Sequence, residues 1–186
     1  MVYEDLEAYD EALEAYSRAA ELEPERGGRY WLRAGVVCQQ LDRHQDALEF
    51  LKGACERLPQ DATAHYHLGL SYDSLGRPDE ALGAYRRAVN LAPREPAYRL
   101  RLGRTAHRLG RLNEAQNETW RALQLNHDDP EIRAQLAAIA EARGDDAEAL
   151  AQYRRAAHLT PGEVQHAKNL AALHRRPGEY GEAIDA

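Results

Sequence analysis

The stretch RPDEALGAYRRAVNLAP, residues 77–93, has two close copies in the same chain. They are AYDEALEAYSRAAELEP at residues 8–24 and DDAEALAQYRRAAHLTP at residues 145–161. Each copy has apolar residues at helical spacing, negative charge near its start and a proline at its end, a pattern that predicts an amphipathic helix. The chain therefore repeats one structural unit along its length.

The repeat has a period of 34 residues, because Leu68-Gly69 recurs as Leu102-Gly103. Two columns of small residues follow the same period. The first column is Ala47, Ala81, Ala115, Ala149 and Ala183, and the second is Ala54, Ala88, Ala122 and Ala156. Self-similarity at a fixed period of this size indicates a repeat architecture rather than a single closed domain.

Each unit predicts two helices. In residues 62–95, Leu68 and Tyr72 belong to a first apolar set, and Gly76 follows as a left-handed C-cap. Pro78 stands where a second helix begins, and Pro93 ends it. Because one hairpin cannot bury both of its faces, neighbouring hairpins must stack. We expect Gly69 and Ala81 to let the paired helix backbones approach closely, and Ala88 to do so for the next unit.

These columns are similar to the pattern of the tetratricopeptide repeat family. The unit 62–95 matches that pattern best, with Leu68, Gly69, Tyr72, Ala81, Tyr85, Ala88 and Pro93. It departs at His65, and other units carry Leu51 and Thr119 at the slot where the family has an aromatic residue. The resemblance implies an all-α fold, a right-handed α-α superhelical solenoid of stacked antiparallel helix hairpins.

The predicted organisation is a single solenoid over residues 1–186. The complete repeats are 28–61, 62–95, 96–129 and 130–163, with a partial repeat at 1–27, mainly a second helix, and another at 164–186. Proline closes several units, at Pro24, Pro59, Pro93 and Pro161. Solenoids normally end in a polar capping helix, and the sequence shows none. We therefore expect a segment of a longer array, the alternative being a natural chain whose ends stack on each other.

The bulk composition excludes several classes of protein. The net charge of −7 argues against nucleic-acid binding. No apolar run is long enough to cross a membrane, and the acidic start MVYEDLEAYDEALEAY does not resemble a signal peptide, so we expect a cytoplasmic protein. Cys38 and Cys55 cannot form a metal cage alone, and we expect both to be buried free thiols.

The motifs that carry catalysis are absent from the sequence. There is no glycine-rich phosphate loop, no H-E-x-x-H and no serine in a nucleophile elbow. We therefore predict no enzymatic activity, no catalytic residue, no cofactor and no metal. On the second helix, Arg86 and Arg87 are interpreted as solvated residues of the outer side.

Function is expected where the period does not dictate the residue. The resemblance implies that one stripe of each first helix lines a concave groove. The candidate residues on it are Arg29, Arg33, Tyr66, His67, Leu70, Leu100, Arg101, Arg104, Arg108, Gln135 and Asn169. Guanidinium groups suit carboxylates and backbone carbonyls, and Tyr66, Leu70 and Leu100 would add apolar contact. We predict a protein-interaction scaffold that binds an extended acidic peptide in this groove.

Several alternatives stay open at this stage. The stripe could consist of ordinary solvated helix residues. The chain could be the substrate-recruiting arm of a larger enzyme such as a glycosyltransferase, or a module that self-assembles into homo-oligomers through its uncapped ends or its groove. Two binding modes of the family are disfavoured. Some members bind two carboxylates with a clamp of lysine and asparagine residues, but Leu32, Val36 and Ala97 occupy positions of that clamp here. Other members carry a ladder of asparagines, of which this chain has only Asn169.

Overall fold

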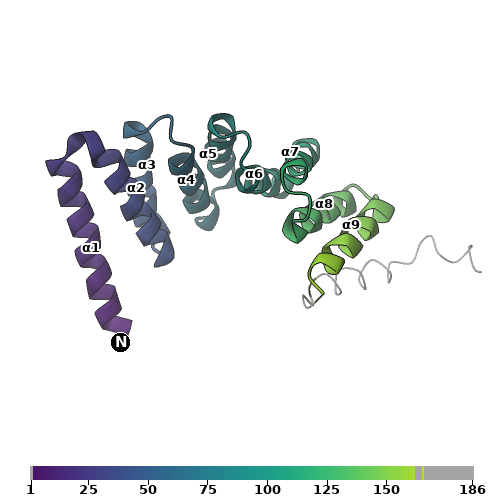
Figure 1. Cartoon of the computed structure of the whole chain (residues 1–186), viewed down its shortest axis with the longest axis horizontal. Coiled ribbons are helices and arrows are strands. Elements are labelled where there is room, and N and C mark those ends of the chain that lie inside the picture. The colour runs from purple at the N-terminus through teal and green to yellow at the C-terminus, as the bar shows by residue number, and fades with distance from the viewer. Residues whose placement is uncertain (1, 162–164, 166–186) are drawn as a thin grey trace, which may run out of the picture.

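The repeated apolar columns fold into a row of helix hairpins. The computed structural model describes residues 2–161 and 165, and within them the chain forms nine helices and no strand. The helices are α1 (Val2–Leu22), α2 (Pro24–Gln40), α3 (His44–Arg57), α4 (Ala62–Ser74), α5 (Pro78–Leu91), α6 (Pro96–Arg108), α7 (Leu112–Leu125), α8 (Pro130–Ala142) and α9 (Asp146–Leu159). They follow one another from α1 at one end of the molecule to α9 at the other (Figure 1). The predicted all-α repeat solenoid is confirmed.

Each hairpin pairs an even-numbered helix with the odd-numbered helix that follows it. The pairs α2–α3, α4–α5, α6–α7 and α8–α9 pack most extensively, and each hairpin then packs on the next through a smaller contact. Contacts between first helices of successive hairpins, such as α2 with α4, are few. The molecule is therefore held together by contacts between neighbours along the chain, as expected of a solenoid.

Left-handed residues close the first helix of each hairpin. Gly76, Gly110 and Gly144 have φ of +69°, +72° and +78°, which confirms the predicted glycine C-cap at these turns. In the first complete hairpin the corresponding residue is Asp42, with φ of 56°. Aspartate is one of the few side chains that tolerate this conformation, so the same turn is kept without a glycine.

The junction between α1 and α2 differs from the predicted one. Pro24 was expected to close a unit, but it is the first residue of α2, and only Glu23 separates the two helices. Proline fits the first turn of a helix because its missing N–H has no partner there. The helix consequently starts ahead of residue 28, and Gly27 and Gly28 are buried within it. Residues 164 and 166–186, which include most of the predicted last repeat, lie outside the described residues.

The core is built from the small-residue columns. The column of Ala47, Ala81, Ala115 and Ala149 is fully buried, as is the column of Ala54, Ala88, Ala122 and Ala156. Gly69 meets a side chain instead of the helix backbone that was expected there. A Cβ atom at Gly69 would lie 2.5 Å from Cε1 of Tyr85. The glycine therefore makes room for the buried tyrosine ring of the paired helix.

Candidate binding groove

A hollow lies at the N-terminal part of the predicted groove. Its volume is about 570 Å³. The lining comes from α1, α2 and the start of α4, and consists of Tyr16, Arg29, Leu32, Arg33, Val36, Val37, Gln40, Asp61 and Thr63. Most of these residues lie on one stripe of α2, because they are three or four residues apart. One helix thus supplies most of the wall, and its two neighbours supply the sides.

The hollow combines two cations with an apolar floor. Leu32 and Val36 are half-buried, whereas Arg29 and Arg33 are exposed. Neither guanidinium has a hydrogen bond or an ion pair within the described part of the chain. Asp61 brings a carboxylate to the same hollow, but its Oδ1 caps α4 by accepting from the backbone N–H groups of Thr63 (2.9 Å) and Ala64 (3.1 Å). The two arginines therefore dominate the charge that the hollow offers to a ligand.

Two other predicted arginines are already paired within the chain. Arg104 contacts Glu131 at 2.7 Å, and Arg108 pairs with Asp73. Asp73 also accepts hydrogen bonds from the Tyr85 hydroxyl (3.0 Å) and from the Thr105 hydroxyl (3.1 Å). A ligand at these positions would have to compete with internal carboxylates. The groove is thus less basic toward its C-terminal end than the sequence suggests.

The residues predicted to make apolar contacts with a ligand differ in how deeply they are buried. Leu100 is only 5% exposed and packs in a core cluster with Ala122, Leu123, Ile132 and Leu136, so little of its side chain is accessible to a ligand. Leu70 and Tyr66 are half-buried against the neighbouring core. The Tyr66 ring stacks on Tyr98 with 4.6 Å between the ring centroids. Arg101 lies half-buried near this group and has no hydrogen bond or ion pair within the described residues.

The polar residues that recur along the stripe link successive first helices. Nδ1 of His67 lies 2.7 Å from Oε1 of Gln39, and the Gln39 amide donates to the His67 carbonyl at 2.7 Å. Two hairpins further along the chain, Gln135 lies 3.2 Å from Nδ1 of His107. Burial lowers the pKa of both imidazoles, which keeps them neutral near pH 7. Asn169, the last candidate, lies outside the described residues.

Of the nine residues that line the hollow, the sequence-based list of contacts contained only Arg29 and Arg33. The other seven are Tyr16, Leu32, Val36, Val37, Gln40, Asp61 and Thr63. Tyr16 could have been found from the opening repeat, because it corresponds to Tyr85 and Tyr153 in the other two copies. Those two tyrosines are buried against the first helix of their own hairpin, at 0% and 4% exposure. Tyr16, by contrast, is half-buried and lines the hollow.

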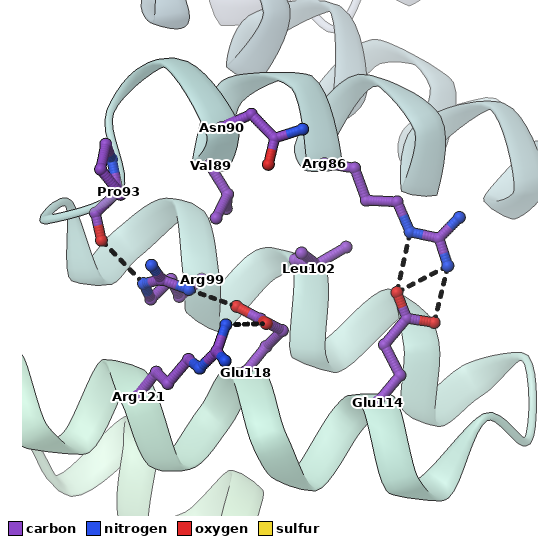
Figure 2. Close-up of a pocket in the computed structure, with 9 residues that line it drawn as sticks. All are labelled: Arg86, Val89, Asn90, Pro93, Arg99, Leu102, Glu114, Glu118 and Arg121. Carbon is purple, nitrogen blue, oxygen red and sulfur yellow. Dashed lines mark hydrogen bonds and ion pairs between the residues drawn. The ribbon is translucent and has the colours of Figure 1, made fainter.

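A second hollow lies between α5, α6 and α7 (Figure 2). Its volume is about 340 Å³, and it contains three arginines that already have carboxylate partners. Arg86 forms a bidentate pair with Glu114, at 2.8 and 2.7 Å. Glu118 accepts from both Arg99 and Arg121. Each of its three arginines is paired with one of its two glutamates, so this hollow joins neighbouring hairpins and leaves no unpaired guanidinium group for a ligand.

The same contacts correct the interpretation of Arg86 and Arg87. Both are exposed, but neither is simply solvated. Arg86 reaches the next hairpin through Glu114, and Arg87 donates to the Pro59 carbonyl at 3.2 Å. They tie α5 to the hairpins on either side of it.

The thiols and the remaining ionisable groups carry no evident chemistry. Both cysteines are free. Cys38 is buried, whereas Cys55 is only half-buried, which is less than expected. Burial raises the pKa of both thiols, that of Cys55 to about 11, so neither is a ready nucleophile. Among the described residues, no cluster of three or more metal-ligating side chains occurs. The described helices also include none that is long and apolar enough to cross a membrane.

Comparison with known families agrees with this geometry. Tetratricopeptide repeat models match residues 1–26, 29–94 and 66–130, which together take in most of the described hairpins. The chain belongs to the tetratricopeptide repeat family. Proteins of this family are in general non-catalytic, and the fold is that of a protein–protein interaction scaffold. No curated protein sequence is significantly similar to the chain.

Solved tetratricopeptide repeat proteins share the fold. YrrB, described as having an unusual peptide-binding site, is 24% identical with a TM-score of 0.75, over 87% of this chain and 83% of its own. TTC0263, a thermophilic protein of Thermus thermophilus, is 27% identical with a TM-score of 0.67, over 92% and 93% of the two chains. MamA is 20% identical with a TM-score of 0.77, over 84% and 91%. At these identities the likeness establishes the architecture of the solenoid.

Proposed function

We propose that the hollow on α2 binds an extended acidic peptide segment of a partner protein. The observation that carries the proposal is the pair of exposed, unpaired guanidinium groups of Arg29 and Arg33 beside the apolar floor of Leu32 and Val36. Guanidinium groups form strong charge-assisted hydrogen bonds with carboxylates. The proposed site is therefore the N-terminal part of the groove, with Arg101 as a further free cation along the same path.

An extended peptide suits both features of this surface. Its side chains alternate between two directions, so acidic residues can reach the arginines while the intervening apolar residues contact the floor. YrrB shares the fold and is described as having a peptide-binding site, which supports a peptide as the class of ligand.

The absence of a membrane-spanning helix among those described is compatible with the cytoplasmic location predicted from the sequence.

The test measures binding of a fluorescent peptide in which Glu alternates with Val. Wild-type protein should bind it in a manner that weakens with salt, because the attraction is between exposed charges. Replacing Arg29 and Arg33 together by Glu should lower the affinity at least about tenfold, since each lost charge-assisted hydrogen bond is worth about 1.5–3 kcal/mol before solvent screening.

The matched control changes the same number of charges away from the groove. Arg154 and Arg155 are exposed on α9 and lie outside the hollow, so their joint replacement by Glu should leave the affinity within about twofold of wild type, a change worth less than about 0.5 kcal/mol. A basic peptide of the same length should not bind. Equal losses in the two double variants would show that net charge alone drives binding and would refute the site.

A further inference from the structure

At the outward face of α7, two positions that are leucine in the other hairpins are both replaced by polar residues. In the other three complete hairpins the corresponding position of the second helix is a buried leucine: Leu48, Leu82 and Leu150, with exposures of 1%, 2% and 6%. In α7 it is Gln116, which is half-buried. The residue that closes the first helix is Leu41, Leu75 or Leu109 in the earlier hairpins, and Arg143 after α8.

The two replacements contact each other. Arg143 donates to Oε1 of Gln116 at 2.9 Å and to Oδ1 of Asn113 at 2.9 Å. An apolar contact between hairpins has thus become a hydrogen-bonded polar one. Because both amides use their oxygen atoms to accept from Arg143, their NH₂ groups remain as donors, with no partner among the described residues.

An aromatic residue completes the change. Trp120 is 38% exposed at the position where the other hairpins carry Lys52, Arg86 and Arg154. It lies in a shallow hollow of about 470 Å³ lined only by α7 residues, namely Asn113, Gln116, Asn117, Trp120, Arg121 and Gln124. The one charge in this lining, Arg121, pairs with Glu118. Arg143 lies beside this lining and donates to two of its amides. An amide-rich face with an exposed tryptophan therefore stands on a chain in which 30% of the residues are charged.

We propose that this α7 face binds the same face of a second copy of the chain and forms a twofold dimer. A twofold interface brings identical surfaces together, so the surface must be complementary to itself. Amide side chains meet that requirement, because each carries both a donor and an acceptor. A face with arginine or lysine at the Trp120 position would instead place like charges opposite each other.

The composition and the spacing support this surface. Tryptophan is enriched at interface hot spots, while lysine and glutamate are depleted from interface centres. Asn113, Asn117, Trp120 and Gln124 follow one another at intervals of four, three and four residues, so they form one continuous line along α7. Contact along one helix is small compared with a permanent interface, and the dimer is accordingly reversible and dependent on concentration.

The first test is the sedimentation of the full chain from low-micromolar to near-millimolar concentration. The wild type should show a reversible monomer–dimer equilibrium. Trp120→Arg, which introduces the type of residue found in the other hairpins, should raise the dissociation constant at least about tenfold. Arg154→Gln, at the corresponding exposed position of α9, should leave the dissociation constant unchanged.

The second test uses charge pairs at Asn117, which is exposed and lies in the middle of the line. Asn117→Lys and Asn117→Glu should each weaken the dimer, because a twofold axis brings like charges together. An equimolar mixture of the two variants should restore association as a mixed dimer, which a folding defect could not produce. A chain that stays monomeric throughout overturns the proposal. So does a dimer that neither Trp120→Arg nor the Asn117 variants weaken, since it would use the solenoid ends or the groove.

Discussion

At the scale of the residue, close packing between paired helices depends on one glycine and one facing side chain. A Cβ atom at Gly69 would lie 2.5 Å from the Tyr85 ring, and one at Gly103 would lie 2.4 Å from the Thr119 hydroxyl. The facing residue changes from tyrosine to threonine, yet the glycine has no spare room in either hairpin. Each hairpin has adjusted its spacing to the side chain it holds, as close packing of interiors requires.

Gly69→Ala and Gly83→Ala should therefore shift stability in opposite directions. At Gly69 the added methyl group overlaps the buried Tyr85 ring, and overpacking of about 1–3 kcal/mol outweighs the gain of about 1 kcal/mol in helix propensity. At Gly83, in the exposed middle of α5, a Cβ atom meets nothing within 4 Å, so alanine should stabilise by about 0.5–1 kcal/mol. Urea unfolding of the two variants checks this, and a gain at Gly69 would contradict the assigned contact.

The half-buried His67 of the groove should make stability depend on pH. Burial lowers the pKa of His67 in the folded protein, so below about pH 6.5 the unfolded chain takes up the proton more readily. Stability from this group is complete above the unfolded pKa and is lost as the pH falls through the folded pKa. His67→Gln should reduce the loss of unfolding free energy between pH 7.5 and pH 5. The exposed His158→Gln serves as the control, and equal losses in both variants and the wild type would refute the role of His67.

At the scale of the element, ion pairs of different burial join the helices around α7. The side chains of Arg99 and Glu118 are 11% and 13% exposed, whereas those of Arg86 and Glu114 are 46% and 27% exposed. Arg99 also donates to the Pro93 carbonyl at 2.8 Å, which ties the first turn of α6 to the start of the loop that precedes it (Figure 2). A corresponding bond joins Arg133 to the His127 carbonyl at 2.7 Å, so the arrangement recurs in the next hairpin.

Removing the two acids of α7 should separate buried from exposed pairing. Glu118→Ala leaves Arg99 largely buried without its carboxylate and should cost about 3 kcal/mol. Glu114→Ala breaks a pair that is mostly in solvent and should cost less than about 1 kcal/mol. Both residues lie on the same helix, so the difference in unfolding free energy is matched for helix propensity. Equal costs would show that the Arg99 pair is not sheltered from water.

The sequence predicts the elements better than the partners of their charged side chains. The columns of Ala81 and Ala88 locate the hairpins because the period of a solenoid directly reflects burial. The period does not reveal that the Leu100 side chain packs in the core, or that Arg104 and Arg108 are paired with carboxylates. The pairing of the two arginines depends on Glu131 and Asp73, which lie in the following and the previous hairpin. Pairing across hairpins depends on rotamers and on the rotation between neighbours, which one-dimensional spacing does not contain.

At the scale of the whole molecule, stability is the sum of hairpins and of the contacts between neighbours. Few contacts reach beyond the adjacent hairpin, so a defect in the middle divides the stack, while a defect near an end shortens it. Ala88 and Ala156 occupy corresponding positions in α5 and α9, and both are fully buried. They therefore allow the same substitution to be compared at a central and at a terminal place.

Ala88→Leu should uncouple the two halves of the solenoid, because overpacking of about 1–3 kcal/mol falls on a central contact. The expected sign is a broader urea transition with a lower apparent m-value, since the halves then unfold separately. Ala156→Leu should leave that transition sharp and lower hydrogen-exchange protection mainly in α8 and α9, where local opening is then easier. Circular dichroism during unfolding and amide exchange measure the two effects. Identical sharp transitions with the same midpoint for both variants would show that the chain unfolds as one closed domain, contrary to the stacked architecture.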